Sequence, residues 1–524
     1  MANHSQSIIN LVCSISVLLV NLIIGFWLSP FIIRTIGVEA NGFVSLASNF
    51  ITYATLIDMA LSSMGSRFIT IEYVKGNYEK ANLYYNSVFW GRLIIIVVLI
   101  GPAVYFVARL EHYINIPYEL LGDVRILFGV MFANFFFSLL IPNWGVATYA
   151  TNQMHRFYIP NAVLTLLRAV LLFGTLTLLT PKVYYLALVS VVIFIITIVV
   201  QWHNKKLLLP KLSLELRKGK RIYSKKAIKE LTGSGVWNSI SSVGNMLLSG
   251  LDLLVCNIYL GPTAMGVLAL SKTLPAHMQS LSSTVRGAFS PSITIGYAKG
   301  DMEAVFRDLR RSMKMTAFMM IIPIAGIETL GDWFYSLWVP SQDARLLQVL
   351  SILGIVGYMF TSGTQILYNV FSTVNKVREN SIAMVSSGVV SIGATVLLVI
   401  FTDFGIFAVA GVSTVVNLIR NMSFTVPYTA KYLGFSWKRF FPQVGQTVIA
   451  SVVLIIMGLL IKPFLPHGSW PNFLISAGIF TAIAVPISFY LLFNHDERVF
   501  ILEKLGSRFK NLAQKFRKKS GASV

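Results

Sequence analysis

The sequence predicts an all-α polytopic membrane protein, and three observations lead to this fold class. Of the 524 residues, 55% are hydrophobic and 12% are charged, whereas soluble domains contain roughly 25% charged residues. Apolar runs of about 20 residues recur as far as residue 493, and each is long enough to cross a ~30 Å hydrocarbon layer as a helix. The runs are continuous and do not alternate apolar with polar residues, so they predict helices and not the strands of a barrel.

About fourteen such runs follow one another along the chain. The first begins after a short segment without Lys or Arg and is too long for the apolar core of a signal peptide, so we expect it to remain as a span. The two cysteines, Cys13 and Cys256, fall inside expected spans, where they are typical small packing residues and imply no disulfide framework. The expected spans are about 8–33, 43–71, 83–107, 124–148, 157–179, 182–202, 235–259, 266–295, 312–331, 346–370, 380–401, 405–428, 444–464 and 471–493.

The basic residues indicate how the spans are oriented. If the N-terminus is cytoplasmic, 31 of the 43 Lys and Arg residues lie in cytoplasmic segments, six lie outside and six fall within spans. Lys and Arg accumulate in cytoplasmic loops of membrane proteins, so we expect both termini on the cytoplasmic side of the membrane. The net charge of +22 is then mainly a membrane-surface feature. The basic residues are scattered over short loops, which argues against a nucleic-acid partner.

A repeat with an offset of 224 residues runs through the sequence. The phrase VKGNYEKAN at 74–82 returns as AKGDMEAVF at 298–306. The same shift also aligns identical residues at intervals along a stretch of some 60 positions, without a gap. Six spans, an even number, separate the two copies, so both halves enter the membrane in the same direction and form a parallel repeat around a pseudo-two-fold axis. The aligned pairs are Asn21 and Asn245, Gly37 and Gly261, Gly42 and Gly266, Leu46 and Leu270, Tyr73 and Tyr297, Lys75 and Lys299, Gly76 and Gly300, and Glu79 and Glu303.

The repeat predicts the domain organisation. We expect two six-helix bundles that face each other across a cleft, joined by a basic linker and followed by two further spans. In the tail, apolar residues at helical spacing are flanked by basic ones, a pattern typical of a helix that lies on anionic lipid headgroups. The expected parts are a first bundle at 1–203, the linker at 204–234, a second bundle at 235–430, the added spans at 431–493 and the tail at 494–524.

Three stretches near the N-terminus resemble a known family. SPFIIRTIGVEANGFVSL at 29–46 contains a Gly-bearing turn after the first span, DMALSSMGSRFIT at 58–70 is a small-residue-rich span that ends in Arg, and KGNYEKAN follows. In this order they resemble the polysaccharide-transporter branch, with the O-antigen flippases, of the multidrug/oligosaccharidyl-lipid/polysaccharide (MOP) superfamily. The resemblance implies a MATE-like fold and flipping of a polyprenyl-pyrophosphate-linked oligosaccharide to the outer leaflet of a bacterial cytoplasmic (inner) membrane. It also suggests polysaccharide polymerase and chain-length proteins as partners.

Basic residues inside the spans are candidates for a cationic cavity. Such residues cost at least ~2.5–3.5 kcal/mol each at the centre of a span, so they normally face a cavity or a partner. Only Asp58 and Asp252 are clear acids within spans, so the interior is net positive and favours an anionic headgroup. Snorkelling or ion pairing is the alternative for each cation. The expected cavity residues are Arg67, Arg286, Arg168, Arg420 and Lys272, whereas Arg92 lies near the start of the third span.

Other polar residues in the spans suggest cleft lining or ion coupling. Asn21 and Asn245 occupy matching positions in the first and seventh spans, where they line the cleft or pack helices together. His277, Asp58 and Asp252 are candidates to carry a coupling H⁺ or Na⁺, or are polar groups satisfied inside a bundle. The chain has no GxxxxGK[ST] phosphate loop, HExxH motif or Cys/His cluster, so no cofactor or metal is expected.

The sequence therefore predicts a flippase that works by alternating access, with a lipid-linked oligosaccharide as substrate. The external loops are too short for the catalytic loop of a membrane glycan polymerase or ligase, so we expect no enzyme. Two alternatives remain, namely a cation-coupled multidrug exporter of the MATE type and a lipid II flippase. The net positive interior disfavours the exporter, because a cavity for organic cations would use acids.

Overall fold

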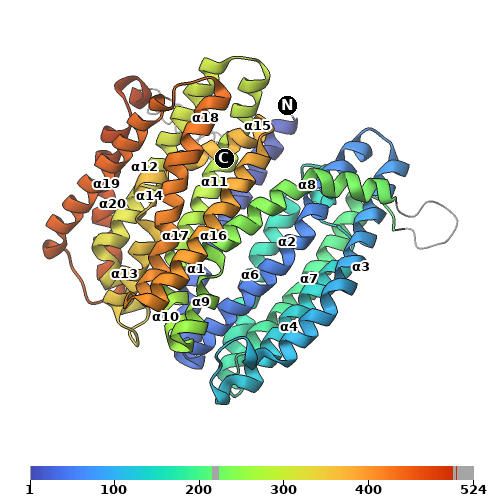
Figure 1. The fold of residues 1–524 in the computed structure, drawn as a ribbon, viewed down its shortest axis with the longest axis horizontal. Coiled ribbons are helices and arrows are strands. Elements are labelled where there is room, and N and C mark those ends of the chain that lie inside the picture. The colour runs from blue at the N-terminus through green and yellow to red at the C-terminus, as the bar shows by residue number, and fades with distance from the viewer. Residues whose placement is uncertain (1, 215–223, 500–502, 504–524) are drawn as a thin grey trace, which may run out of the picture. The chain divides into compact units, whose positions relative to one another are not determined.

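The computed structural model describes residues 2–214, 224–499 and 503, and these residues form helices and connecting turns without a strand (Figure 1). The all-α fold class is confirmed. Part of the expected basic linker (215–223) and most of the expected amphipathic tail (500–502 and 504–524) lie outside the described residues. The described chain forms two compact units, which we call unit 1 and unit 2.

Unit 1 contains the residues up to Thr273 together with Val377–Val416. Within it α3, α4 and α7 lie side by side (Figure 1), and α2 packs against α3, α8 and α10. Its helices are α1 (Ala2–Ile36), α2 (Val38–Val74), α3 (Tyr78–Ala108), α4 (Leu121–Leu140), α5 (Val146–Ala150), α6 (His155–Leu178), α7 (Tyr185–Leu208), α8 (Lys225–Asn245), α9 (Asp252–Leu260), α10 (Pro262–Ser271), α16 (Val377–Phe401) and most of α17 (Ile406–Arg420).

Unit 2 contains Leu274–Lys376 and the chain from Asn417 onward. Its centre is α12, which packs against α13, α19 and α20. Its helices are α11 (Thr273–Ala298), α12 (Met302–Trp338), α13 (Ala344–Ile355), α14 (Tyr358–Thr361), α15 (Tyr368–Thr373), α18 (Val426–Leu433), α19 (Phe441–Ile461) and α20 (Trp470–Leu492). The expected division into two six-helix bundles joined at 204–234 stays a prediction.

Helices occupy each of the fourteen expected spans. Among the described residues, twelve helical segments are long and apolar enough to cross a membrane, or thirteen if the two parts of α2 count as one bent span. The expected span at 266–295 is not among them, because it is divided between α10 and α11. The first fourteen residues of α11, 273–286, contain eight polar side chains, which lowers the hydropathy of this helix below that of a lipid-facing span.

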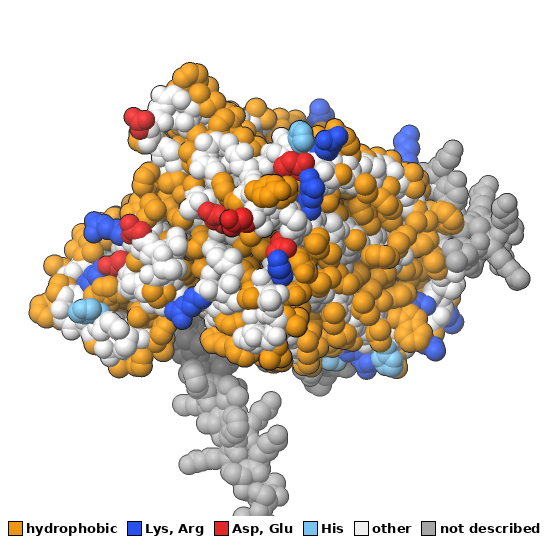
Figure 2. All heavy atoms as spheres, turned by 90° about the horizontal axis from the view of Figure 1, so that it is seen from below, with side chains coloured by type: hydrophobic (Ala, Val, Ile, Leu, Met, Phe, Trp, Pro, Cys, Tyr) orange, Lys and Arg blue, Asp and Glu red, His pale blue; other side chains and the backbone are white. Residues whose placement is uncertain are grey.

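The outer surface is rich in large apolar side chains. Val97, Leu178 and Phe401 are 76%, 84% and 76% exposed. Figure 2 shows one face on which hydrophobic side chains predominate and charged ones occupy only a few places. Soluble proteins rarely expose apolar patches larger than a few hundred Å², so this surface is suited to lipid.

The repeated phrase adopts the same local structure in both copies. Gly76 and Gly300 have φ values of 78° and 74°, in the left-handed region that glycine enters without strain. After each glycine, Asn77 or Asp301 caps the next helix by accepting a hydrogen bond from the backbone N–H three residues later. The phrase is therefore a helix end, a tight turn and a helix start, which explains its Gly and its Asn or Asp.

Repeat-related residues also touch one another inside unit 1. A Cβ atom on Gly42 would lie 2.9 Å from the Cα atom of Gly266, so α2 and α10 approach closely because both positions are glycine. Thr263 donates a hydrogen bond to Glu39, its counterpart at the offset of 224 residues. Contacts between equivalent residues are what a pseudo-two-fold axis produces, so such an axis passes between α2 and α10.

Candidate functional site

Two arginines of unit 2 converge on one tyrosine. Arg286 lies on α11, Arg420 ends α17, and Tyr368 is the first residue of α15. The guanidinium carbons of Arg286 and Arg420 lie 5.8 Å and 5.3 Å from the centroid of the Tyr368 ring, within the range of cation–π contacts. Nη2 of Arg420 also donates to the Tyr368 hydroxyl at 2.6 Å. One ring thus links two cations that are more than 130 residues apart.

Neutral acceptors hold the Arg286 guanidinium. Oε1 of Gln365, on the 3₁₀-helix η4 (Thr364–Leu367), accepts from Nη1 of Arg286 at 2.9 Å and from the Ser282 hydroxyl at 2.7 Å. Gln365 is only 5% exposed. Nδ2 of Asn369 donates to the backbone carbonyl of Arg286 at 3.0 Å, which holds α11 against α15.

Neutral groups also contact Arg420. Its Nη2 donates to Oδ1 of Asn417 at 2.6 Å, and the Tyr368 hydroxyl donates to Oδ1 of Asn421 at 2.8 Å. Asn421 opens η5, a π-helical turn at Asn421–Thr425. A π turn inserts an extra residue into a helix and often occurs at functional sites.

The arrangement is suited to an anion. We define Arg286, Gln365, Tyr368, Asn417 and Arg420 as the arginine–tyrosine cluster. None of the ion pairs formed among the described residues includes Arg286, and its hydrogen-bond partner is an uncharged amide. Guanidinium groups bind phosphate oxygens in bidentate fashion, so the cluster has the chemistry to bind a phosphate or diphosphate.

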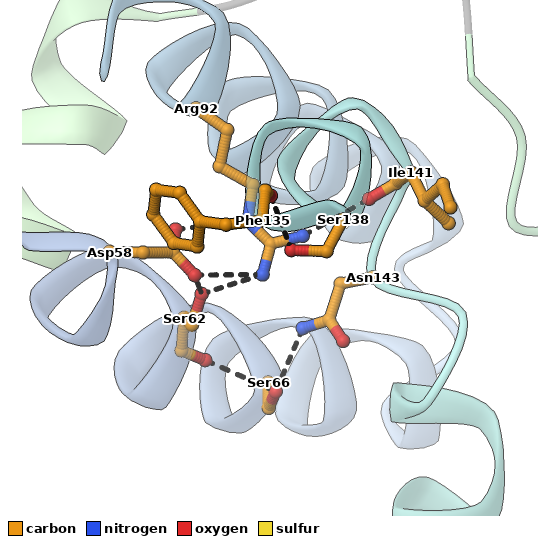
Figure 3. Close-up of polar contacts among 8 residues, drawn as sticks. All are labelled: Asp58, Ser62, Ser66, Arg92, Phe135, Ser138, Ile141 and Asn143. Carbon is orange, nitrogen blue, oxygen red and sulfur yellow. Dashed lines mark hydrogen bonds and ion pairs between the residues drawn. The ribbon is translucent and has the colours of Figure 1, made fainter. Parts of the chain in front are cut away.

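Unit 1 contains a contrasting site in which an arginine is neutralised (Figure 3). Nε and Nη2 of Arg92 on α3 donate to the two carboxylate oxygens of Asp58 on α2, each at 3.0 Å. The Ser62 hydroxyl accepts from Nη2 at 2.8 Å and donates to Asp58, while Nη1 donates to the Ile141 carbonyl at 3.1 Å. The two charged side chains are 12% and 13% exposed. This is a bidentate ion pair with further hydrogen bonds to a hydroxyl and a backbone carbonyl.

A second tethered cation neutralises the other intramembrane acid. The Lys272 ammonium bonds to Oδ2 of Asp252 and to the Ser249 carbonyl. Ser249 belongs to η3 (Met246–Gly250), a π turn between α8 and α9, and Tyr53 donates to the Gly250 carbonyl of the same turn. Asp58 and Asp252 are therefore each paired with a cationic side chain of this protein.

The remaining expected site residues are dispersed. Arg67 on α2 and Arg168 on α6 are exposed and take part in no ion pair within the described part of the chain. Asn21 is exposed and accepts from the Thr165 hydroxyl at 2.9 Å, and Asn245 is exposed at the end of α8. His277 is partly buried on α11. Of the five expected cavity cations, the structure brings together Arg286 and Arg420 and pairs Lys272 with an acid, and the cavity role of each stays a prediction.

The repeat relates the two arginine sites. The offset of 224 residues places Asp58 at Ser282 and Ser62 at Arg286. In the first copy the carboxylate and the hydroxyl hold Arg92, whereas in the second copy the hydroxyl and the guanidinium share the Gln365 amide oxygen. Equivalent positions on equivalent helices thus form a neutral site in one copy and a cationic site in the other.

Sequence reasoning missed the uncharged members of the cluster. Gln365, Tyr368 and Asn369 interrupt the apolar run at 346–370, and Asn417 and Asn421 flank Arg420. Both sets follow i, i+3, i+4 spacing, which places their side chains on one helical face. Polar triplets with this spacing inside apolar spans were the available signal.

Comparisons with known proteins agree with this architecture. The sequence matches no family model. It is 26% identical over 498 residues to a Bacillus subtilis (strain 168) protein named "Uncharacterized membrane protein EpsK", covering 95% of this chain and 97% of that protein. A solved inward-facing structure of a multidrug resistance MATE family transporter of the MOP superfamily superposes with a TM-score of 0.65 at 14% identity, covering 82% of this chain and 99% of that one. The chain has a MATE-like fold.

A second solved structure extends the likeness to a flippase. The lipid II flippase MurJ, in an inward closed conformation, superposes with a TM-score of 0.58 at 15% identity and covers 92% of this chain and 98% of that one. An outward-facing MATE structure gives a TM-score of 0.57 at 14% identity. At these identities the likeness concerns the fold.

Proposed function

We propose that this protein is a MOP-type flippase that moves a polyprenyl-pyrophosphate-linked oligosaccharide across the bacterial cytoplasmic membrane, with both termini inside. The MATE-like fold supports membrane transport, since the similar solved structures are transporters and a flippase. The observation that supports an anionic substrate is the arginine–tyrosine cluster, in which Arg286 has an uncharged partner. Surface polysaccharide biosynthesis is the pathway in which such a lipid is consumed.

The cluster addresses the main physical obstacle to flipping this lipid. A diphosphate and a hydroxyl-rich glycan are too costly to move through hydrocarbon unaided. Two guanidinium groups bound to one ring offer the diphosphate several charge-assisted N–H donors in a fixed arrangement. Their binding to the diphosphate replaces part of its hydration while the head moves between leaflets.

The helix that carries Arg286 also exposes polar side chains. Gln279, Ser280, Ser283 and Thr284 are exposed along one side of α11, whereas the exposed side chains of α3 include Ile94, Val97, Val98 and Val104. Hydroxyl and amide groups are unfavourable against lipid tails. Their exposure supports a hydrated path for the glycan along α11.

The driving force of the cycle is part of this proposal. Coupling to H⁺ or Na⁺ at Asp58, Asp252 or His277 requires that an external cation compete with Arg92 at Asp58 or with Lys272 at Asp252. No resident cofactor is proposed. Anionic membrane lipids and polysaccharide polymerase or chain-length proteins are the proposed partners.

A multidrug exporter of the MATE type is the second candidate, because a MATE transporter shares the fold. A cavity for organic cations needs free carboxylates, and Asp58 and Asp252 are both bound by cations of the chain itself. The charge distribution therefore favours an anionic substrate. A lipid II flippase differs from the main proposal only in the glycan that the lipid carries.

Deletion of the gene in its host tests the proposal. We expect polyprenyl-pyrophosphate oligosaccharide to accumulate in the cytoplasmic leaflet and the surface polysaccharide to disappear. Restoration by the wild-type gene, and not by a variant with Arg286→Ala, would connect the phenotype to the cluster. Normal surface glycan together with greater sensitivity to cationic drugs would instead support the exporter.

A further inference from the structure

An elongated apolar groove runs between α3 and α4 in unit 1, and we call it the α3–α4 groove. Its volume is about 540 Å³. Small residues, among them Ala103 and Gly129, leave space at the point where the two helices would otherwise pack closely. The exposed side chains of Val104 and Phe137 border this space. Arg125, at one end, is the only charged residue that lines it.

The length of the groove corresponds to one membrane leaflet. On α3 its lining extends from Ile96 to Ala108, a rise of about 18 Å at 1.5 Å per residue. Half of a ~30 Å hydrocarbon core is about 15 Å. Because α3 ends at Ala108 and α4 begins at Leu121, the groove starts at the membrane surface and extends to about the middle of the bilayer.

Two arginines lie at or next to the end of the groove at the membrane surface. Arg125 donates through Nη2 to Oε2 of Glu111 at 2.6 Å, while its Nε is buried without a hydrogen-bond partner among the described groups. Arg109, next to Ala108 of the lining, is exposed. Arg125 and Arg109 are thus found at or next to this end together with Glu111, while the acid Asp123, two residues before Arg125, is paired with Lys182. The two arginines are complementary to a phosphate diester.

We propose that the α3–α4 groove binds one anionic phospholipid, with an acyl chain along the apolar lining and the phosphate at Arg125. Hydrocarbon chains are the medium around these helices, so an apolar concavity of this length fills with one of them. The charge at its end selects among the lipids that supply the chain. This site is separate from the arginine–tyrosine cluster and does not depend on the proposed substrate.

Native mass spectrometry of the full-length protein tests the proposal, after release from nanodiscs that contain equal amounts of phosphatidylglycerol and phosphatidylcholine. We expect one retained phosphatidylglycerol on the wild-type protein. Val104→Trp and Ala133→Phe fill the groove from α3 and from α4, and each should reduce that adduct about tenfold because the cavity is lost. Arg125→Gln should also reduce it about tenfold, because one charge-assisted interaction is lost. Val97→Trp, on α3 outside the groove, and Arg345→Gln, on α13, are the matched controls and should retain it.

Three outcomes would overturn the proposal. Equal retention of both lipids by the wild-type protein would contradict selection by charge. Equal retention of phosphatidylglycerol by the wild-type protein and all folded variants would show annular lipid only. Displacement of phosphatidylglycerol by an equal concentration of polyprenyl diphosphate would assign the groove to the substrate chain. The two filling variants lie on different helices, so either one that retains the wild-type melting temperature decides the test.

Discussion

Individual arginines of this protein obtain their partners in two different ways. Arg92 is neutralised by Asp58 within a bidentate pair, and Arg286 is held by the uncharged amide of Gln365. The charge of a buried cation with a carboxylate partner is balanced within the protein, whereas a cation held by neutral groups retains its affinity for an anion. This contrast at single residues is the basis for proposing that the substrate site lies in unit 2.

The cluster predicts how Arg286 and Arg420 respond to substitution. Arg286→Ala or Arg420→Ala should weaken binding of inorganic pyrophosphate to the purified protein by roughly 10- to 100-fold, because a hydrogen bond to a charged group contributes ~1.5–3 kcal/mol. Arg286→Lys should retain part of the affinity through its charge. Calorimetric titration measures the effect, with Arg345→Ala, exposed on α13, as the matched control. Unchanged binding in both Ala variants would remove the cluster from the site.

The Asp58–Arg92 pair predicts a large stability effect. Asp58→Asn leaves Arg92 partly buried without its countercharge, which costs about 3–5 kcal/mol for a buried pair, so the melting temperature should fall clearly. The double substitution of both residues by Leu removes the stranded charge and should recover most of the loss. A double variant that melts as low as the single one would show that the stabilisation comes from other contacts of these side chains.

At the scale of helices, the contact between α2 and α10 depends on glycine. A Cβ atom on Gly266 would lie 2.7 Å from the Val38 carbonyl oxygen, so Gly266→Ala should destabilise the protein by ~1–3 kcal/mol through overpacking. Gly174→Ala on α6 is the matched control, because no atom lies within 4 Å of its added Cβ. The control should be neutral or stabilising by up to ~1 kcal/mol. Thermal unfolding compares the two, and equal melting temperatures would contradict the close approach.

The segment after α20 is attached to α12 through an ion pair. Lys314, 2% exposed on α12, donates to Oε2 of Glu497 at 2.6 Å. Burial of Glu497 by itself raises the pKa of its carboxyl, but the hydrogen bonds from Lys314 and the Asn494 N–H and the charges of Lys314 and Arg310 outweigh burial. The pKa is therefore lowered from its usual 4.5. A lowered pKa stabilises the folded state above the unfolded value, and that stability is lost as the pH falls through the folded value.

Thermal unfolding against pH tests this attachment. The contribution of the pair to the melting temperature should be complete above about pH 4.5 and should decline below it. Glu497→Gln should melt lower than the wild type at pH 7, and the difference should shrink under acid conditions. Glu303→Gln removes the exposed pair with Arg439 and should have little effect at any pH, since surface ion pairs contribute ~0–1 kcal/mol. A difference that persists at pH 3 would contradict this account.

Sequence periodicity predicts helices better than it predicts what they contact. The apolar runs and the repeated Gly-Asn and Gly-Asp turns located the helices, because hydrophobicity and turn conformation depend on local sequence. The sequence indicates Arg286 and Arg420 as candidates because a charged side chain is energetically costly within a membrane span. It does not indicate Tyr368 and Gln365, because they are uncharged and acquire their role only when α11 and α15 pack together. The polar side chains at 273–286 already show that α11 is less apolar than a lipid-facing span. Counting spans by their length alone does not reveal this.

At the scale of the whole molecule, the duplicated sequence has diverged at its charged sites. The two copies retain the same turns and caps at Gly76 and Gly300, while Asp58 and Ser62 correspond to Ser282 and Arg286. A symmetric pair of cationic sites would double the energetic cost of charge in the membrane. Under the proposed function, the neutral site at Asp58 and the cationic site at Arg286 fit a single anionic headgroup.

The most direct test is translocation in reconstituted vesicles. Proteoliposomes that contain the purified protein and a polyprenyl-pyrophosphate oligosaccharide are treated with an external glycosidase that cannot cross the bilayer. The account predicts that the wild-type protein makes the glycan pool of the inner leaflet accessible to the enzyme, whereas Arg286→Ala and Arg420→Ala leave it protected and Arg345→Ala behaves as the wild type. Equal protection with wild-type protein and with empty vesicles, together with uptake of a cationic dye, would contradict the flippase.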